Sequence, residues 1–191
     1  MNLTNVRCSY GGWLKTTPHH RRTMKELLLG CGSRTKKQLS IGKDTEFENV
    51  TRVDINPDHN PDIICDITKH PLPFNDNEFD EIHIYDVLEH LAQQGDYKFF
   101  FEEFTEYARI LKNGGHFFAS VPAETSPWLW GEPSHKRVIN EHTLTFLNQQ
   151  LYGQVGTTAM SDFRYIYKAD FVKVYTNIIE DTFLFILEVR K

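Results

Sequence analysis

The sequence contains little that would assign a protein class at once. Its three cysteines, Cys8, Cys31 and Cys65, are widely spaced along 191 residues. This odd number forms neither a disulfide framework nor a zinc motif, so we expect a reducing, cytoplasmic location. No apolar run approaches the length of a membrane span, and the N-terminal residues lack the apolar core of a secretion signal. A membrane is therefore not an expected partner.

An excess of positive charge is also missing. The formal net charge is −5 at pH 7, whereas a protein that binds nucleic acid without sequence preference needs a basic surface. A nucleic-acid partner is disfavoured but stays open, because the basic pairs at 21–22, 36–37 and 136–137 would form a patch if they converge. The adjacent His19 and His20 have no third ligand nearby in sequence, so no metal site is predicted.

The composition predicts one folded domain. Hydrophobic residues make up 40% of the chain and charged residues 25%, a balance that is typical of globular proteins. We expect a single domain over residues 1–191, in which residues 1–24 form an irregular lead-in that is interrupted by Gly11, Gly12 and Pro18.

The clearest local feature is a run of three leucines that ends in a glycine turn. Residues 27–29 are apolar on both sides, as a parallel strand covered on both faces requires. Gly30 and Gly32 follow; without a β carbon they accept positive φ angles and let a ligand lie against the backbone. At the carboxyl end of a central strand, such a turn occupies the place where open α/β sheets bind ligands.

The rest of the chain predicts an α/β fold. Apolar and β-branched runs predict further strands at 50–55, 61–67, 79–85, 116–121, 163–175 and 182–190. Helices are predicted at 86–91, 97–112 and 140–151, with Asp86 and Asn140 as N-caps and residues 113–115 ending the second helix. Too few residues join the second and third strands for a crossover helix. We therefore expect a Rossmann-like, mostly parallel sheet with an antiparallel strand near its edge and reduced helices around strands one to three.

Five short segments follow one another along the chain. Each one carries glycines or acids at the end of a predicted strand, or the turn between a predicted helix and strand. They are residues 27–33, 53–57, 62–67, 79–91 and 111–117. Their order and spacing resemble the class I S-adenosylmethionine-dependent methyltransferases. Within the fourth segment, Val-Leu-Glu-His-Leu is similar to the form found in a branch of small methyltransferases. The resemblance covers roughly residues 25–121 and implies S-adenosylmethionine as the cofactor.

The resemblance also implies which residues contact this cofactor. The turn formed by Gly30, Cys31 and Gly32 would receive its amino-acid tail. Asp54, with Ile55 beside it, ends the second strand and would accept hydrogen bonds from both ribose hydroxyls.

The adenine and methionine parts are assigned in the same way. Asp66 would bind the adenine amino group, while the Ile67 N–H reaches a ring nitrogen, and Tyr85 and Asp86 would lie near the methionine part. Each acid has a local alternative: Asp54 and Asp66 would also suit the turns that follow them, and Asp86 would suit a helix N-cap.

Residues 122–139 form a long segment that we expect to lie as a loop over the active site. His135 is the first candidate for a general base, because the family often places acceptor contacts after the fifth strand. Asp86 and His90 are the other catalytic candidates. A surface role for His135, and a structural role for His90 paired with Glu89, stay open.

Other residues of this segment are less specific. Glu132 and Lys136 are further polar candidates near the acceptor. Trp128 and Trp130 would either close an apolar acceptor pocket or attach the loop to the core.

We therefore expect an S-adenosylmethionine-dependent methyltransferase that acts on an unknown acceptor, with a small molecule favoured. Alternatives are a nucleic-acid or protein acceptor and a non-catalytic subunit or scaffold that binds S-adenosylmethionine. A nicotinamide oxidoreductase is disfavoured, since the third glycine of its fingerprint is missing from residues 33–37. The oligomeric state is not predicted.

Overall fold

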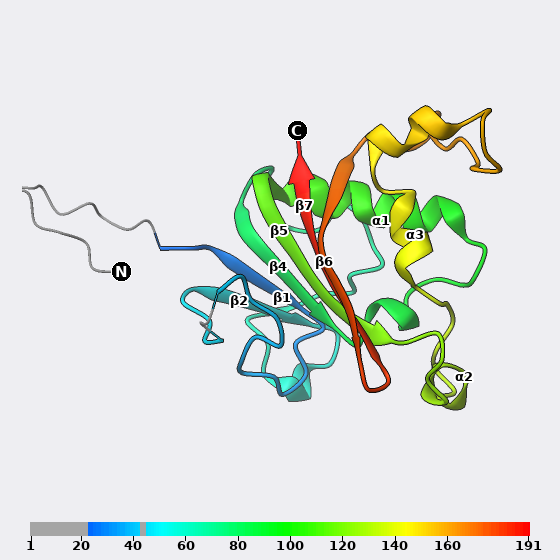
Figure 1. Cartoon of the computed structure of the whole chain (residues 1–191). Helices are drawn as coiled ribbons and strands as arrows, with labels where there is room; N and C mark the ends of the chain where they lie inside the picture. The colour runs from blue at the N-terminus through cyan, green and yellow to red at the C-terminus, as the bar shows by residue number, and fades with distance from the viewer. Residues whose placement is uncertain (1–22, 43–44) are drawn as a thin grey trace, which may run out of the picture.

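A computed structural model describes residues 23–42 and 45–191. Nearly all of the expected lead-in, with Cys8 and the His19–His20 pair, lies outside these residues. Seven strands form one sheet in the described part of the chain, in the order β3-β2-β1-β4-β5-β7-β6 (Figure 1). Their bounds are β1 Glu26–Leu29, β2 Val50–Asp54, β3 Ile63–Ile64, β4 Phe79–Tyr85, β5 Leu111–Pro122, β6 Asp170–Ile179 and β7 Thr182–Arg190.

The strand directions confirm the predicted fold class. Strands β1 to β5 pair in parallel, whereas β7 is antiparallel to both β5 and β6. The antiparallel strand is therefore the last but one at its edge, as the sequence predicts. The carboxyl ends of the parallel strands β1 to β5 lie at the same edge of the sheet, so the residues after them gather there.

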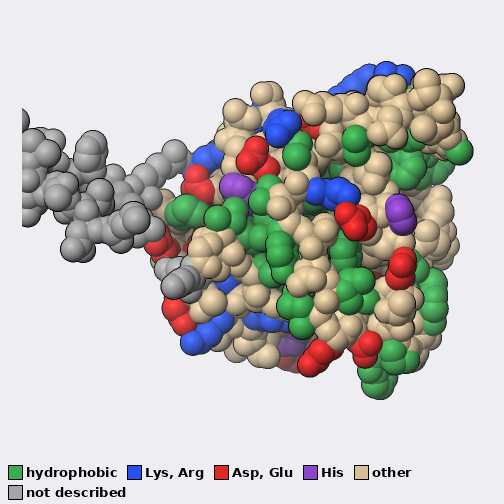
Figure 2. Space-filling view, in the orientation of Figure 1, with side chains coloured by type: hydrophobic (Ala, Val, Ile, Leu, Met, Phe, Trp, Pro, Cys, Tyr) green, Lys and Arg blue, Asp and Glu red, His purple; other side chains and the backbone are tan. Residues whose placement is uncertain are grey.

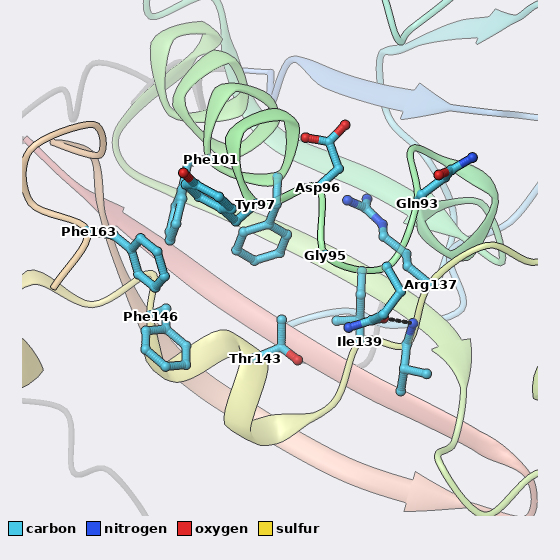
Figure 3. A pocket seen from close by; sticks show the side chains of 13 residues that line it. Gln93, Gly95, Asp96, Tyr97, Phe101, Arg137, Ile139, Thr143, Phe146 and Phe163 are labelled. Atoms are coloured by element: carbon cyan, nitrogen blue, oxygen red, sulfur yellow. Dashed lines mark hydrogen bonds between the residues drawn. The ribbon is translucent and has the colours of Figure 1, made fainter. Parts of the chain in front are cut away.

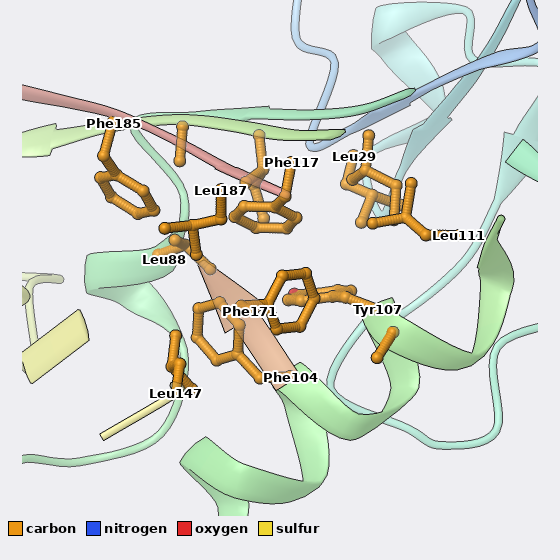
Figure 4. Close-up of a cluster of buried hydrophobic side chains, with 14 of the residues drawn as sticks. Leu29, Leu88, Phe104, Tyr107, Leu111, Phe117, Leu147, Phe171, Phe185 and Leu187 are labelled. Carbon is orange, nitrogen blue, oxygen red and sulfur yellow. The ribbon is translucent and has the colours of Figure 1, made fainter. Parts of the chain in front are cut away.

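Helix α1 (Tyr97–Ile110) covers one face of the sheet, as Figure 1 shows. Its first turn is capped by Asp96, whose side chain accepts a hydrogen bond from the Phe99 N–H at 3.2 Å. Its aromatic stripe packs onto β5 and the terminal hairpin, forming the main core (Figure 4). The central side chains of this core are Phe104, Tyr107, Phe117, Phe171, Phe185 and Leu187.

The opposite face is covered by irregular chain around β1 and β4. Leu28, Tyr85 and Phe118 form a small buried cluster there, against which Leu39 and Phe47 pack. The Tyr85 hydroxyl hydrogen-bonds to the backbone of Leu39, accepting from its N–H at 3.2 Å and donating to its carbonyl at 3.3 Å. In the described residues between β1 and β2 no helix forms, which confirms the predicted reduction.

The remaining helices are short. They are η1 (Pro57–His59), η2 (Leu88–His90), α2 (Trp128–Gly131), α3 (Glu141–Thr145) and η3 (Gln149–Gln154). Within the described part of the chain, no helix is long and apolar enough to cross a bilayer.

The structure corrects the predicted helix at 86–91. Only one 3-10 turn, η2, forms there, and Val87 rather than Asp86 occupies its cap position. Asp86 has a φ of 57°, and its carboxylate accepts hydrogen bonds from Ser120 at 2.9 Å and from Arg34 at 3.3 Å. Because these contacts hold the side chain elsewhere, the predicted N-cap is wrong.

The predicted glycine stop after α1 is also wrong. Helix α1 ends at Ile110, and the extended, fully buried Leu111 begins β5 at once. Residues 113–115 therefore lie inside β5, next to an irregular register between β4 and β5. Burial of Leu111 against the sheet outweighs the local preference of glycine for a helix end.

Further details of the secondary structure differ from expectation. The capping box of Asn140 and Thr143 confirms the predicted N-cap, but α3 ends at Thr145. Strand β6 begins at Asp170 rather than at 163, and β3 has only two residues. The long segment 122–139 contains the short helix α2.

Candidate active site

The glycine turn after β1 opens onto a cavity. Gly30 has a φ of 61°, and a β carbon on it would lie 2.4 Å from Val87 Cγ2. Gly32 has a φ of 49°, but a β carbon there would meet no atom within 4 Å. Gly30 therefore permits close packing, whereas Gly32 borders open space in which a ligand can approach the backbone.

This strand-end cavity has a volume of about 350 Å³, within the range of small-molecule sites. Most of its lining follows the carboxyl ends of β1, β2, β3 and β4. The lining residues are Gly30, Gly32, Asp54, Ile55, His59, Cys65, Asp66, Ile67, Thr68, Val87, His90 and Leu91.

Asp54 connects two walls of the strand-end cavity. One carboxylate oxygen accepts from the Gly32 N–H at 2.8 Å, and the other accepts from the Asn56 N–H at 2.9 Å. Burial alone would raise the pKa of Asp54, but these hydrogen bonds, with His59 at 3.2 Å, outweigh burial and lower the pKa. The carboxylate is thus held ionised and fixed. Its Oδ2 accepts from both Gly32 and His59, whereas Oδ1 accepts only from Asn56 and retains one lone pair.

Asp66 and Ile67 line the same cavity beyond β3. Asp66 accepts hydrogen bonds from the Thr68 N–H at 3.1 Å and from its hydroxyl at 2.7 Å. The predicted turn role of Asp66 is therefore present, and it fixes the carboxylate at the rim of the cavity. Ile55 is 65% exposed at the other side.

Three predicted cofactor residues do not line this cavity. The Cys31 side chain lies in the small buried cluster, and its N–H donates to the Val53 carbonyl at 3.0 Å. Tyr85 belongs to the same cluster. Asp86 faces the neighbouring cavity instead.

Sequence reasoning missed several lining residues, of which His59 is the most informative. It contacts Asp54 from the 3-10 turn that Asn56 and Pro57 begin. That turn is visible in the sequence, but the direction of the His59 side chain depends on the tertiary structure. Thr68 and Val87 were missed for the same reason.

A second cavity of about 390 Å³, the histidine cavity, lies beside the first. His90 lines both cavities, so it is their common wall. The histidine cavity is lined by Asp86, Glu89, His90, Pro122, Ser126, Trp128, Glu132, His135, Asp181 and Thr182. The structure thus brings the three predicted catalytic residues, Asp86, His90 and His135, to one cavity.

The two histidines are held by neighbouring polar groups. Their ring centroids are 4.7 Å apart in an edge-to-face arrangement. His135 Nδ1 donates to the Leu129 carbonyl at 3.1 Å, and His90 Nδ1 lies 3.0 Å from the Ser134 hydroxyl. Burial lowers the pKa of His90, and the charge of His135 lowers it further.

Glu89 lies beneath the histidines and is only 1% exposed. Its Oε1 is 3.9 Å from His135 Nε2, while its buried Oε2 has no hydrogen-bond partner among the described residues. Burial raises the pKa of Glu89 to about 8, outweighing the opposing contribution of Arg137.

Comparison with known proteins identifies the fold that carries these cavities. The family described as "Methyltransferase domain" matches residues 27–119, a span that includes the glycine turn, η2 and strands β2 to β4. Residues 27–119 thus form a methyltransferase domain. No curated protein matches it.

Solved structures agree at the level of the fold. An S-adenosylmethionine-dependent methyltransferase from Archaeoglobus fulgidus is 17% identical, with a TM-score of 0.55 over 90% of this chain and 88% of that chain. The N-methyltransferase NodS from Bradyrhizobium japonicum WM9, in complex with S-adenosylhomocysteine, is 14% identical, with a TM-score of 0.54 over 88% and 79%. An S-adenosylmethionine-dependent methyltransferase from Mesorhizobium loti is 11% identical, with a TM-score of 0.52 over 87% and 91%.

In this methyltransferase, Arg137 fixes the segment that carries His135. Its Nε donates to the Leu88 carbonyl at 2.7 Å, and its Nη2 contacts Glu103 Oε2 at 2.6 Å. The N–H groups of Lys136 and Arg137 also donate to the Glu89 carbonyl, at 2.8 and 3.3 Å. These bonds join the segment to η2 and so bring His135 to Glu89.

On its other side, Arg137 borders a third, smaller cavity of about 160 Å³ (Figure 3). Phe101, Phe146 and Phe163 surround it, and they come from α1, from the end of α3 and from the segment before β6. The Arg137 guanidinium also lies 5.9 Å from the Phe100 ring centroid, and both members of the Arg137–Glu103 pair are buried.

Of Trp128 and Trp130, only Trp128 lines the histidine cavity, and neither is buried. Each of these two side chains is 65% exposed. The side chain of α2 that attaches this segment to the core is Leu129, which is 2% exposed.

Proposed function

We propose that the strand-end cavity binds S-adenosylmethionine and that the histidine cavity receives the methyl acceptor. The observation that carries this proposal is the shared wall: His90 lines both cavities. Methyl transfer requires the sulfonium carbon and the acceptor atom to come together, and the two cavities adjoin at the His90 side chain.

The residues of the strand-end cavity suit the parts of the cofactor. Gly32 borders open space and would let the amino-acid tail approach the backbone. Asp54 is held ionised, and its Oδ1 retains a lone pair for a ribose hydroxyl. Asp66 and the Ile67 N–H would contact adenine, with exposed Ile55 covering it.

Methyl transfer requires the protein mainly to position the acceptor, because the methyl group of S-adenosylmethionine is already activated. An acceptor lone pair attacks the methyl carbon, the carbon–sulfur bond breaks, and its electrons return to sulfur, which leaves neutral S-adenosylhomocysteine. A proton on the acceptor must leave to a base or to water. Asp86, His90 and His135 face the cavity in which this acceptor would stand.

The size of the histidine cavity and the charge of the surface favour a small molecule as the acceptor. The compartment that we propose is the cytoplasm. The histidine cavity, at about 390 Å³, has the volume of a small-molecule site. On the face seen in Figure 2, positive and negative side chains are interspersed, whereas nucleic-acid binding uses a continuous basic surface. We place both cavities in one domain, with residues 122–139 beside the acceptor.

Calorimetry with S-adenosylhomocysteine tests the cofactor site. We expect one site per chain, and we expect Asp54→Ala to weaken binding by about 1–3 kcal/mol, since the ribose loses its charged acceptor. Asp58→Ala is the matched control, because this exposed acid belongs to the same turn but does not line the cavity. Equal affinity in wild type and Asp54→Ala would contradict the ribose assignment.

Methyl transfer needs its own measurement. The protein would be incubated with labelled S-adenosylmethionine and, separately, with pools of small molecules, RNA and proteins. Label transferred to a small-molecule pool supports the proposal, while transfer only to RNA or protein overturns the acceptor class. Tight S-adenosylhomocysteine binding without transfer to any pool would instead support a non-catalytic subunit.

A further inference from the structure

The floor of the histidine cavity holds three groups of a kind that binds metal ions. Glu89, His90 and His135 each offer one ligand atom, and these atoms lie within 4.8 Å of one another. We propose that these residues bind a divalent transition-metal ion of the zinc, iron and manganese class. This site goes beyond methyl transfer and does not depend on the assignment of the cofactor cavity.

The ligand types fit that class of ion. Two imidazoles and one carboxylate form a set that suits zinc and iron, and such sets leave coordination positions open for other molecules. Zinc bonds of about 2.0–2.2 Å place neighbouring ligand atoms about 3–4 Å apart. The 3.9 Å between Glu89 Oε1 and His135 Nε2 is already in this range.

The histidines are oriented as metal ligands usually are. A ligating histidine typically donates its other ring N–H to a carbonyl or another acceptor, which fixes the tautomer. His135 does so, because Nδ1 donates to the Leu129 carbonyl and leaves Nε2 with a free lone pair toward Glu89. The Ser134 hydroxyl holds His90 Nδ1, and Glu132 in turn accepts from that hydroxyl at 2.9 Å.

An independent observation comes from the carboxylate. Glu89 is 1% exposed, and its Oε2 has no partner among the described residues. A buried, unpaired polar atom is costly, so native structures seldom keep one without a ligand or another function. A cation in front of this carboxylate would supply the missing partner.

A second cluster in the same protein provides the contrast. Glu26, Glu81 and His83 also bring ligand atoms within 4.8 Å of one another. There, however, the Lys37 ammonium forms an ion pair with both carboxylates and supplies a cation. In the described residues no lysine or arginine ion pair reaches Glu89, and this difference selects the histidine cavity as the metal site.

The place of the site indicates what the ion would do. It lies in the cavity next to the common wall, so an open coordination position would face the same space as the acceptor. A hard or borderline divalent ion there would bind an oxygen of the acceptor. This role of the ion, unlike the metal site itself, rests on the proposed function. Acceptors with a hydroxyl beside a second oxygen would bind best, since two oxygens can occupy two open positions.

Metal binding can be measured without knowing the acceptor. The full chain would be freed of metal with EDTA, desalted and titrated with zinc chloride and manganese chloride by calorimetry, with bound metal counted after dialysis. We expect one ion per chain. Glu89→Gln and His135→Gln should each weaken metal binding by roughly 10- to 100-fold. Ser134→Ala should weaken it by about tenfold, because Ser134 only positions the His90 ring.

Two control variants separate this site from other histidines. His116→Gln removes a histidine that lies 3.8 Å from Glu188 without a third ligand, and the double variant His19→Gln/His20→Gln removes the adjacent pair near the N-terminus. Both should bind metal as the wild type does. Thermal melting shows that the variants fold, and S-adenosylhomocysteine affinity in metal-free buffer, expected to be unchanged in Glu89→Gln, separates this proposal from the cofactor assignment.

Three results would overturn the proposal. They are a metal-free wild type that takes up no ion, wild-type affinity in both Glu89→Gln and His135→Gln, and loss of binding in the His19/His20 variant alone. If metal binds as expected and S-adenosylhomocysteine does not, the metal site stands and the cofactor assignment fails.

Discussion

The backbone of Gly30 lies directly against the side chain of Val87, so that a β carbon at position 30 would be 2.4 Å from Val87 Cγ2. The turn after β1 and the chain after β4 are thereby packed together at the edge of the strand-end cavity. We expect Gly30→Ala to reduce the free energy of unfolding by about 2–5 kcal/mol, from a positive φ and overpacking together. Urea unfolding measures this loss.

Gly32→Ala is the matched control for Gly30→Ala. Gly32 also has a positive φ, but a β carbon there meets no atom within 4 Å. Its cost should be the backbone term alone, about 1–2 kcal/mol. Val87→Ala should recover part of the loss in Gly30→Ala, and equal costs for the two glycine variants would contradict the packing argument.

The Arg137–Glu103 pair should contribute strongly to stability when one partner is removed. Both side chains are buried, and their atoms are 2.6 Å apart. Arg137→Ala leaves the Glu103 carboxylate buried with only the Tyr107 hydroxyl, so we expect a loss of about 3–5 kcal/mol in denaturant unfolding. The exposed pair of Arg164 and Asp162 is the comparison, and Arg164→Ala should cost at most about 1 kcal/mol.

Acid should destabilise the protein through Glu81. Burial would raise its pKa, but hydrogen bonds from His83 and Lys37 outweigh burial and lower the pKa to about 2. A carboxylate with a lowered pKa stabilises the fold above its unfolded pKa of 4.5, and this contribution is lost as the pH falls from 4.5 toward 2.

The Glu81 contribution can be isolated by comparing unfolding curves across that pH range. The wild type should lose about 3 kcal/mol more than Glu81→Gln as the pH falls. Glu141→Gln, which removes an exposed acid paired with Lys173, should follow the wild type. Parallel curves for the wild type and Glu81→Gln would show that Glu81 does not cause the acid sensitivity.

The two histidines should differ in their effect on cofactor binding. His90 lines both cavities, whereas His135 lines only the histidine cavity. In metal-free buffer we expect His90→Ala to weaken S-adenosylhomocysteine binding by about 1 kcal/mol, roughly fivefold, with His135→Ala unchanged. The reverse order, measured by calorimetry, would contradict the assignment of the common wall.

Local patterns in the sequence were sufficient to predict most strands of the sheet. The run of leucines in β1 and the alternating apolar residues of β7 are such patterns, because they involve only residues that are neighbours in sequence. Asp86 is different, because the bonds that hold it come from Arg34 and Ser120, distant in sequence. Local propensity predicts a helix there, and those tertiary bonds replace it with a left-handed residue and a short 3-10 turn.

The two cavities also differ in how far the sequence predicts them. Asp54 and Asp66 were predictable as neighbours because parallel strands end at one edge of a sheet. The meeting of Glu89 with His135 was not, since it depends on the bond between Arg137 and the Leu88 carbonyl, 49 positions apart. The family resemblance predicted His90 and His135 near the acceptor, but two histidines 45 positions apart in sequence carry no local signal that their rings lie in contact.

The wall that His90 forms has a thermodynamic consequence. A ligand that moves this side chain while filling one cavity changes the free energy of filling the other, and the change is reciprocal. If an acceptor or a metal ion raises cofactor affinity by some factor, the cofactor raises the affinity of that partner by the same factor. Cooperative binding of the two substrates would then follow from a single imidazole, with no rearrangement of the sheet.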